Sequence, residues 1–182
     1  MPAFFVSKKP FLDAQNNMKQ IPEPHIYESN IASDEKFMNL ALAEASKAEM
    51  LGDVPVGSVI INSKGDVVAS GYNQREISND PTQHAEIVVL QQAAAALKRW
   101  RMSDCTLFVT LEPCFMCAGA LVQARMGRVV FAASDAKGGA GGSLANVLND
   151  SRLNHRCIVN SGVKSTEASE MLTHFFRQKR LK

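Results

Sequence analysis

The side chains best suited to chemistry lie in two short groups of the sequence. His84 and Glu86 form the first group, and Cys114 and Cys117 form the second, at C-x-x-C spacing directly after a proline. One imidazole and two thiolates are ligands that zinc takes in proteins, and three protein ligands leave the fourth tetrahedral position for water. The sequence therefore predicts a catalytic zinc site, because a structural site would use a fourth protein ligand.

Glu86 follows the histidine by two positions and supplies the acid and base that such a site needs. Zinc lowers the pKa of a bound water to about 7, so that a hydroxide nucleophile forms at neutral pH. A neighbouring carboxyl can transfer protons between this water, a ring nitrogen of the substrate and a leaving amine. We therefore predict that Glu86 is the catalytic proton shuttle, with His84, Cys114 and Cys117 as the metal ligands.

The elements that must position these residues follow from periodicity and from cap and turn signals. Helices are predicted from Ser33 to Gly52, from residue 80 to 97, over 113–125, over 144–148 and from residue 165 or 166 onward. Strands are predicted over 54–62, 67–72, 106–111, 128–132 and 157–160, with a glycine-rich loop at 137–142. This order predicts an α/β domain with a mixed sheet of about five strands and helices on its faces.

Two of the predicted helices begin at the candidate ligands. A capping pattern at residues 80–83 predicts a helix start there, which places His84 and Glu86 in its first turn or just before it. Residues two apart in a helix diverge by about 200°, so both can face one site only if His84 has partly non-helical geometry at the cap. Cys114 and Cys117 lie three apart on one face of the next helix.

Length and composition are those of one globular domain, with 182 residues, 46% of them hydrophobic and 21% charged. Residues 1–32 contain four prolines and no lasting period, which predicts an N-terminal extended or disordered arm before a single zinc-dependent domain at 33–182. The sequence has no signal-peptide pattern and no apolar run near the ~20 residues that span a bilayer. We therefore expect a cytoplasmic protein without a membrane partner.

Other interpretations of individual residues stay open at this stage. The zinc pattern could be coincidental or half of a structural zinc ribbon, although a ribbon needs a second ligand pair that the chain lacks. Cys105 and Cys157 have no spaced partner and are better explained by core packing. The net charge of +2 is too small to indicate nucleic acid, and the basic residues of 177–182 are either a phosphate-binding end or a solvated tail.

Longer strings of the sequence resemble the bacterial tRNA-specific adenosine deaminases, which belong to the cytidine-deaminase-like superfamily. The zinc pattern alone is common to that superfamily. The strings span roughly residues 35 to 180 and are Pro55-Val56-Gly57, Gly71-Tyr72-Asn73, His84-Ala85-Glu86-Ile87, residues 110–120, Gly127-Arg128-Val129-Val130-Phe131, Asp135-Ala136-Lys137, Asn154-His155-Arg156 and Phe175-Phe176-Arg177. The strings around Asp135 and at the terminal Phe-Phe-Arg indicate the tRNA enzymes in particular.

This resemblance implies a three-layer α/β/α sandwich with a mixed five-stranded sheet, and hydrolytic deamination of the wobble adenosine of a tRNA anticodon to inosine. It implies one zinc per subunit, a homodimer and a tRNA anticodon stem-loop as the partner. It places Asn73 at the edge of the base, Asp135 and Lys137 along the flanking nucleotides, and the last helix, with Phe176 and Arg177, beside the RNA. Ser134 stands where we expect a basic residue.

Two competing functions use part of the same pattern. A deaminase of free cytosine, guanine or a nucleoside would have the same ligands and the same glutamate, but it would have no use for a basic terminal helix. A zinc-stabilised RNA-binding module without catalysis would have no use for Glu86 beside an open coordination position. Deamination of a stem-loop, compared with deamination of free bases, distinguishes these functions.

Overall fold

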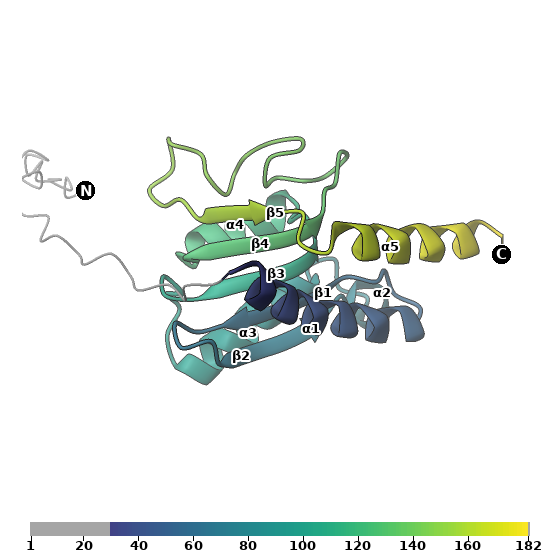
Figure 1. Ribbon diagram of the computed structural model, residues 1–182, viewed down its shortest axis with the longest axis horizontal. Coiled ribbons are helices and arrows are strands. Elements are labelled where there is room, and N and C mark those ends of the chain that lie inside the picture. The colour runs from purple at the N-terminus through teal and green to yellow at the C-terminus, as the bar shows by residue number, and fades with distance from the viewer. Residues whose placement is uncertain (1–29, 182) are drawn as a thin grey trace, which may run out of the picture.

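The computed structural model describes residues 30–181, which form a five-stranded mixed sheet in the order β2-β1-β3-β4-β5 (Figure 1). The strands are β1 (Gly57–Ile61), β2 (Val67–Tyr72), β3 (Thr106–Leu111), β4 (Arg128–Ala133) and β5 (Ile158–Ser161). The helices are α1 (Ile31–Met50), α2 (Arg75–Ser78), α3 (Ala85–Leu97), α4 (Phe115–Gln123) and α5 (Ser165–Arg180). The predicted α/β class and mixed five-stranded sheet are confirmed, whereas most of the predicted arm at 1–32 lies outside the described residues.

Helices cover both faces of this sheet, as the three-layer prediction requires. Helices α1 and α5 pack on one face, and α3 and α4 pack on the other (Figure 1). Alternate strand residues separate two cores, because successive side chains of a strand point to opposite faces. The core between the sheet and helices α3 and α4 contains Ile60, Leu107, Val109, Val129 and Phe131. The core between the sheet and helices α1 and α5 contains Val59, Ile61, Phe108, Val130 and Ala132.

The strand directions bring distant segments to one edge of the sheet. Strands β3, β4 and β5 are parallel, so β3 and β4 both end at this edge, where Leu111 pairs with Ala133. Strand β1 runs antiparallel to β3 and to β2, so β1 begins and β2 ends at the same edge, where Gly57 pairs with Tyr72. The segments after β2, β3 and β4 therefore meet the segment before β1, and the candidate site lies there.

Helix α1 begins earlier than the sequence predicts and packs closely on β1. Its cap is Asn30 rather than Ser33, and the two residues form a reciprocal capping box in which each side chain accepts a hydrogen bond from the other's backbone N–H. A Cβ atom on Gly57 would lie 2.0 Å from the Ala41 carbonyl oxygen. Position 57 therefore requires glycine, because α1 approaches the strand too closely for a side chain. Such a close approach is a common reason for a glycine in a strand.

Three local predictions are wrong. The capping signal at Asp80 forms a turn instead of a helix start, because the Asp80 carboxylate accepts hydrogen bonds from the Thr82 backbone N–H and hydroxyl. Helix α3 consequently begins at Ala85, and α4 likewise begins at Phe115 rather than at residue 113. Residues 144–148 form turns and a bridge rather than a helix, and α2 was not predicted.

None of the helices within residues 30–181 is both long enough and apolar enough to cross a membrane.

Candidate active site

His84 and Cys114 are the cap residues of α3 and α4, and this position sets the geometry of the site. Their backbones are extended, with φ −72° and ψ 152° at His84 and φ −72° and ψ 174° at Cys114. The non-helical backbone that we predicted for His84 is confirmed. The N-termini of the two helices therefore point at one place, where their partial positive charge favours thiolates.

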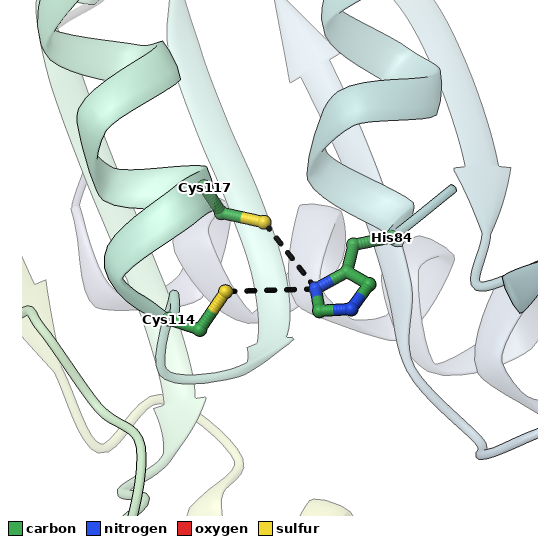
Figure 2. A group of neighbouring side chains, drawn as sticks. All are labelled: His84, Cys114 and Cys117. Atoms are coloured by element: carbon green, nitrogen blue, oxygen red, sulfur yellow. Dashed lines mark hydrogen bonds between the residues drawn. The ribbon is translucent and has the colours of Figure 1, made fainter. Parts of the chain in front are cut away.

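The three candidate ligands converge at this place (Figure 2). The Nδ1 atom of His84 lies 3.6 Å from the Sγ atom of Cys114 and 3.5 Å from that of Cys117, and all three donor atoms lie within 4.8 Å of one another. Tetrahedral zinc with bonds of about 2.3 Å to sulfur and about 2.0–2.1 Å to nitrogen separates such donors by about 3.6 Å. The donor types and their spacing therefore fit a zinc ion.

Hydrogen bonds among these donors shift their pKa values. The Cys117 thiol donates a hydrogen bond to Cys114, and this bond, together with one from His84, lowers the pKa of Cys114 to about 3. The same bond and burial raise the pKa of Cys117. The pKa of His84 is also raised, first of all by its hydrogen bond with Cys114. A metal ion at this position displaces these protons, because it binds thiolates and a neutral imidazole.

Glu86 lies in the first turn of α3 with only 4% of its surface exposed, and it lines the same cavity as His84 and Cys114. Burial raises the pKa of Glu86 to about 7 in the metal-free chain, since a charged carboxylate loses its hydration there. A carboxyl of this kind accepts and donates protons near neutral pH. The extended backbone at His84 allows both side chains to face the cavity although they are only two positions apart.

The cavity has a volume of about 240 Å³ and is bounded by the chain segments that meet at the sheet edge. Its walls combine apolar residues with polar groups at defined positions, as in small-molecule sites generally. Besides His84, Glu86 and Cys114, it is lined by Val54, Val56, Asn73, Arg75, Ala85, Leu111, Glu112, Asp135 and Phe176. Of the predicted substrate-binding residues, Asn73, Asp135 and Phe176 are therefore brought to the cavity.

The other two predicted contacts lie elsewhere. Lys137 lines a groove beside the cavity, together with Ser134, Asp135, Phe176 and Arg180. Arg177 lies instead in a neighbouring depression along α5, which shares Thr173 with this groove, and it does not line the cavity or the groove. Arg180, about one helical turn further on, lines this groove, and within the described part of α5 it is the arginine nearer to the candidate site.

Glu112 was not predicted and organises the loop that follows β4. Its carboxylate is buried and accepts hydrogen bonds from the backbone N–H groups of Asp135, Gly141 and Ser143, at 2.9 Å each, and from the Ser143 hydroxyl. Burial alone would raise the pKa of Glu112, but these hydrogen bonds outweigh it and hold the pKa below its usual value. The position of Glu112 next to the Cys114 segment was the only signal in the sequence, because its partners are distant along the chain.

A three-layer α/β/α fold with one histidine and two cysteines grouped as candidate metal ligands, and a buried glutamate beside them, is the arrangement that zinc-dependent nucleobase deaminases share. The profile of the MafB19-like deaminases matches residues 32–180. The chain is 46% identical to a tRNA-specific adenosine deaminase of Bacillus subtilis (strain 168) over 152 residues, which cover 84% of this chain and 94% of the relative. A relative of the same description from Haemophilus influenzae is 45% identical over 147 residues, which cover 81% of this chain and 85% of the relative.

Solved structures agree with the sequence comparison. A structure from a study of A-to-I editing by tRNA:A34 deaminases is similar with a TM-score of 0.70 and 40% identity, covering 75% of this chain and 99% of that chain. A guanine deaminase of Bacillus subtilis is similar with a TM-score of 0.53 and 38% identity, covering 55% of this chain and 64% of that chain. The chain belongs to the MafB19-like deaminase family and, within it, to the tRNA-specific adenosine deaminases. The resemblance found in the sequence is thus confirmed.

Proposed function

We propose that the protein hydrolyses the wobble adenosine of a tRNA anticodon to inosine and ammonia, with one zinc ion per subunit. One observation supports this function above the others. His84, Cys114 and Cys117 lie at the spacing of tetrahedral zinc ligands, and the buried carboxyl of Glu86 lines the same cavity. Relatives with 45–46% identity are described as tRNA-specific adenosine deaminases, which supports the same substrate.

His84, Cys114 and Cys117 would hold the zinc ion, which would supply a water molecule with its pKa lowered to about 7. Glu86 takes a proton from the attacking water and delivers it to N1 of the adenine ring. The oxygen of this water bonds to C6. As the bond from C6 to the exocyclic amine breaks, the same carboxyl transfers the second proton of the former water from this oxygen to the leaving amine, so that ammonia departs and inosine, with its C6 carbonyl and N1–H, remains. The walls formed by Val54, Val56 and Leu111 limit competing water around these proton transfers.

The reacting nucleotide is flipped out of the base stack of the RNA, because its ring must enter a cavity of about 240 Å³. Asn73 contacts the edge of this nucleotide from the wall of the cavity. Asp135 at the rim accepts a hydrogen bond from a ribose hydroxyl, a group that DNA lacks. Phe176 is 46% exposed at the same rim and offers a ring on which a neighbouring base can stack.

Beyond the rim, the groove lined by Lys137 and Arg180 receives the backbone of the flanking nucleotides. Ser134 contributes a hydroxyl to this groove in place of the basic residue that we expected. Arg177, which we predicted as a further RNA contact, reaches the RNA only if the stem also passes along the outer part of α5. The proposal therefore assigns the larger phosphate contribution to Arg180.

The remaining parts of the proposal concern the whole protein. The chain forms a homodimer with each site near the subunit interface, and exposed apolar side chains beside the ligands, Phe115 and Met116, are consistent with such an interface. It acts in the cytoplasm, where tRNA and reduced thiols are both present. The deaminase domain extends from the start of α1 through α5, so it begins two positions before the predicted residue 33.

The decisive experiment measures inosine formation in an anticodon stem-loop with adenosine at the wobble position. Free adenosine, cytosine and guanine are tested in parallel. We expect the stem-loop to be deaminated far faster than any free base. Faster deamination of guanine or cytosine would instead indicate a small-molecule deaminase of the same family.

The matched control is Glu86→Gln, which has nearly the same size and lacks the proton-transfer group. It should retain zinc and fold but lose about 10²- to 10⁴-fold in rate, as expected for a missing general acid and base. Near-native turnover of this variant would remove Glu86 from the mechanism. Loss of zinc from this variant would point to a fourth protein ligand.

A further inference from the structure

Asp53 lies directly before the cavity segment and is fully buried, with 0% of its surface exposed. No lysine or arginine is paired with it in the ion pairs of residues 30–181. Its carboxylate instead accepts four hydrogen bonds. Oδ1 accepts from the Asn73 side-chain amide at 2.7 Å and from the Val54 backbone at 2.8 Å, and Oδ2 accepts from the backbone N–H groups of Glu76 and Ile77 at 2.8 and 3.2 Å.

These contacts determine which way the Asn73 amide points. A carboxylate and a carbonyl oxygen can only accept hydrogen bonds, so the group of Asn73 that faces them must be the NH2 group. Its Nδ2 atom donates to Asp53 Oδ1 at 2.7 Å and to the Val54 carbonyl oxygen at 3.3 Å, which uses both protons. The amide of Asn73 therefore cannot turn around while Asp53 is in place.

The oxygen of the same amide is left for the cavity. Asn73 lines the cavity, whereas Asp53 does not. Among the described residues no donor is bonded to Asn73 Oδ1, and this atom is not one of the fully buried side-chain atoms without a partner. It is thus an acceptor that faces the space in which a substrate binds.

We propose that Asp53 is a positioning residue for the deaminase reaction. It fixes Asn73 so that the Oδ1 atom faces the cavity and accepts a hydrogen bond from an N–H or O–H group of the flipped nucleotide. The inference rests on the proposed function, since it takes the cavity as the nucleotide site. Asp53 does not touch substrate or metal, and it acts only through Asn73. Asp53 also accepts hydrogen bonds from Glu76 and Ile77 and so stabilises the start of α2. The experiments must therefore distinguish loss of Asn73 positioning from loss of α2 structure.

The variant Asp53→Asn keeps the size of the side chain but replaces one of its hydrogen-bond acceptors with a donor. The amide oxygen of this asparagine can still accept the hydrogen bonds from Glu76 and Ile77 in α2. Its NH2 group then faces the NH2 group of Asn73. Asn73 must turn its amide around to accept this bond, which presents a donor to the cavity in place of an acceptor. We expect kcat/KM to fall about tenfold to hundredfold, the range for a buried polar group that faces the wrong partner. Zinc content should not change.

A double-mutant cycle with Asn73→Ala tests whether Asp53 acts through Asn73. When Asn73 is absent, Asp53→Asn should cause little further loss of kcat/KM. If Asp53 only stabilised α2, Asp53→Asn would lower the activity equally in the wild-type chain and in the Asn73→Ala variant. Equal losses in the two backgrounds, or an unchanged kcat/KM in the single variant, would overturn the proposal.

The exchanged pair, Asp53→Asn with Asn73→Asp, covers the case in which Asp53→Asn alone does not fold. In the exchanged pair Asn at 53 donates to one carboxylate oxygen at 73, and the other oxygen again faces the cavity as an acceptor. Activity should recover above that of either single variant, and a failure to recover in a folded, zinc-loaded protein would overturn the proposal. The matched control is Asp66→Asn, because Asp66 accepts from Asn62 at 3.0 Å in the β1–β2 turn, far from the site.

All rates are measured on the stem-loop and on free bases, with the wild-type chain in every series. A wild-type chain that deaminates only a free base contradicts the proposed tRNA substrate, and the cycle is then evaluated on that base. The two proposals can therefore fail separately.

Discussion

Arg128 and Asp34 form a buried, bidentate ion pair between β4 and the first turn of α1. Arg128 Nη1 donates to Asp34 Oδ1 at 2.9 Å and Nη2 donates to Oδ2 at 2.6 Å, while Nε donates to Asn160 Oδ1 on β5 at 2.8 Å. The two side chains are only 11% and 9% exposed. The pair joins segments that are 94 positions apart, so it fixes where α1 lies on the sheet.

Breaking this pair should destabilise the fold without affecting the chemistry. Asp34→Asn removes the buried carboxylate charge that faces the Arg128 guanidinium, and the free energy of unfolding should fall by about 3 kcal/mol. Urea unfolding of the zinc-loaded protein measures this change. The matched control is Glu167→Gln, which breaks the solvent-exposed pair with Lys164 and should change the stability very little. Equal effects of the two substitutions would contradict the prediction.

Zinc affinity should increase with pH. In the metal-free chain the pKa values of Cys117 and His84 are raised, so both groups hold protons that zinc must displace, whereas Cys114 is already a thiolate with a pKa of about 3. Protons therefore compete with the metal, and the competition grows as the pH falls. Competition with a chromophoric chelator at a series of pH values measures this dependence. A pH-independent affinity would mean that the ligands are already deprotonated without metal.

The adjacent rings of the last helix should respond differently to truncation. Phe175 is 7% exposed and belongs to the packed interior, whereas Phe176 is 46% exposed at the cavity rim. Phe175→Ala should lower the free energy of unfolding by about 3 kcal/mol. Phe176→Ala should leave stability nearly unchanged and weaken stem-loop binding by about 1–3 kcal/mol, the value of one lost base–aromatic stack. Thermal unfolding and binding measured on both variants test the assignment, which a reversed pattern would refute.

Substituting Gly139 should disturb the loop that contributes Asp135 to the site. A Cβ atom at Gly139 would lie 2.4 Å from the Glu112 carboxyl and 2.6 Å from the Asp135 carbonyl oxygen, so the loop must move. We expect Gly139→Ala to raise KM for the stem-loop severalfold while zinc content stays the same. Gly119→Ala in α4 is the matched control, because a Cβ atom there has no neighbour within 4 Å and alanine favours a helix. Identical kinetics of the two variants would exclude this role of the loop.

Arg180 should contribute more to RNA binding than Arg177. Arg180 lines the groove beside the cavity, and Arg177 lies in a separate depression. Arg180→Gln should reduce the slope of log K against log salt by roughly 0.7, the value for one contact with a single-stranded phosphate. Arg177→Gln should reduce it less. A larger effect at Arg177 would show that the RNA crosses the other part of α5.

The sequence was sufficient to predict the sheet and the group of side chains that converges at the candidate site. The strands at 106–111 and 128–132 are short apolar segments with clear limits, and the ligand spacing depends on only two local patterns. The two helix starts were predicted less well. At Asp80 a side chain bonded to Thr82 produces a turn that has the same local signal as a helix cap.

What the sequence could not predict depends on contacts between distant segments. Helix α2 has four residues, and its first N–H groups are bonded to Asp53, 23 and 24 positions earlier. The role of Glu112 likewise arises from bonds to a loop that begins 23 positions later. The choice between Arg177 and Arg180 depends on how α5 is rotated on the sheet, which a local sequence pattern does not specify.

The positions of His84 and Cys114 as helix caps have a consequence for the folding of the chain. A metal ion held between them closes a loop, because the two residues are 30 positions apart. A permanent cross-link around a loop of this length would stabilise the fold by about 3–4 kcal/mol through the entropy of the unfolded chain. A zinc ion bound by these residues would be a removable cross-link of the same kind, joining the N-terminal caps of two helices. A cell short of zinc would therefore contain chains that are less stable as well as inactive, and proteolysis would remove these chains first.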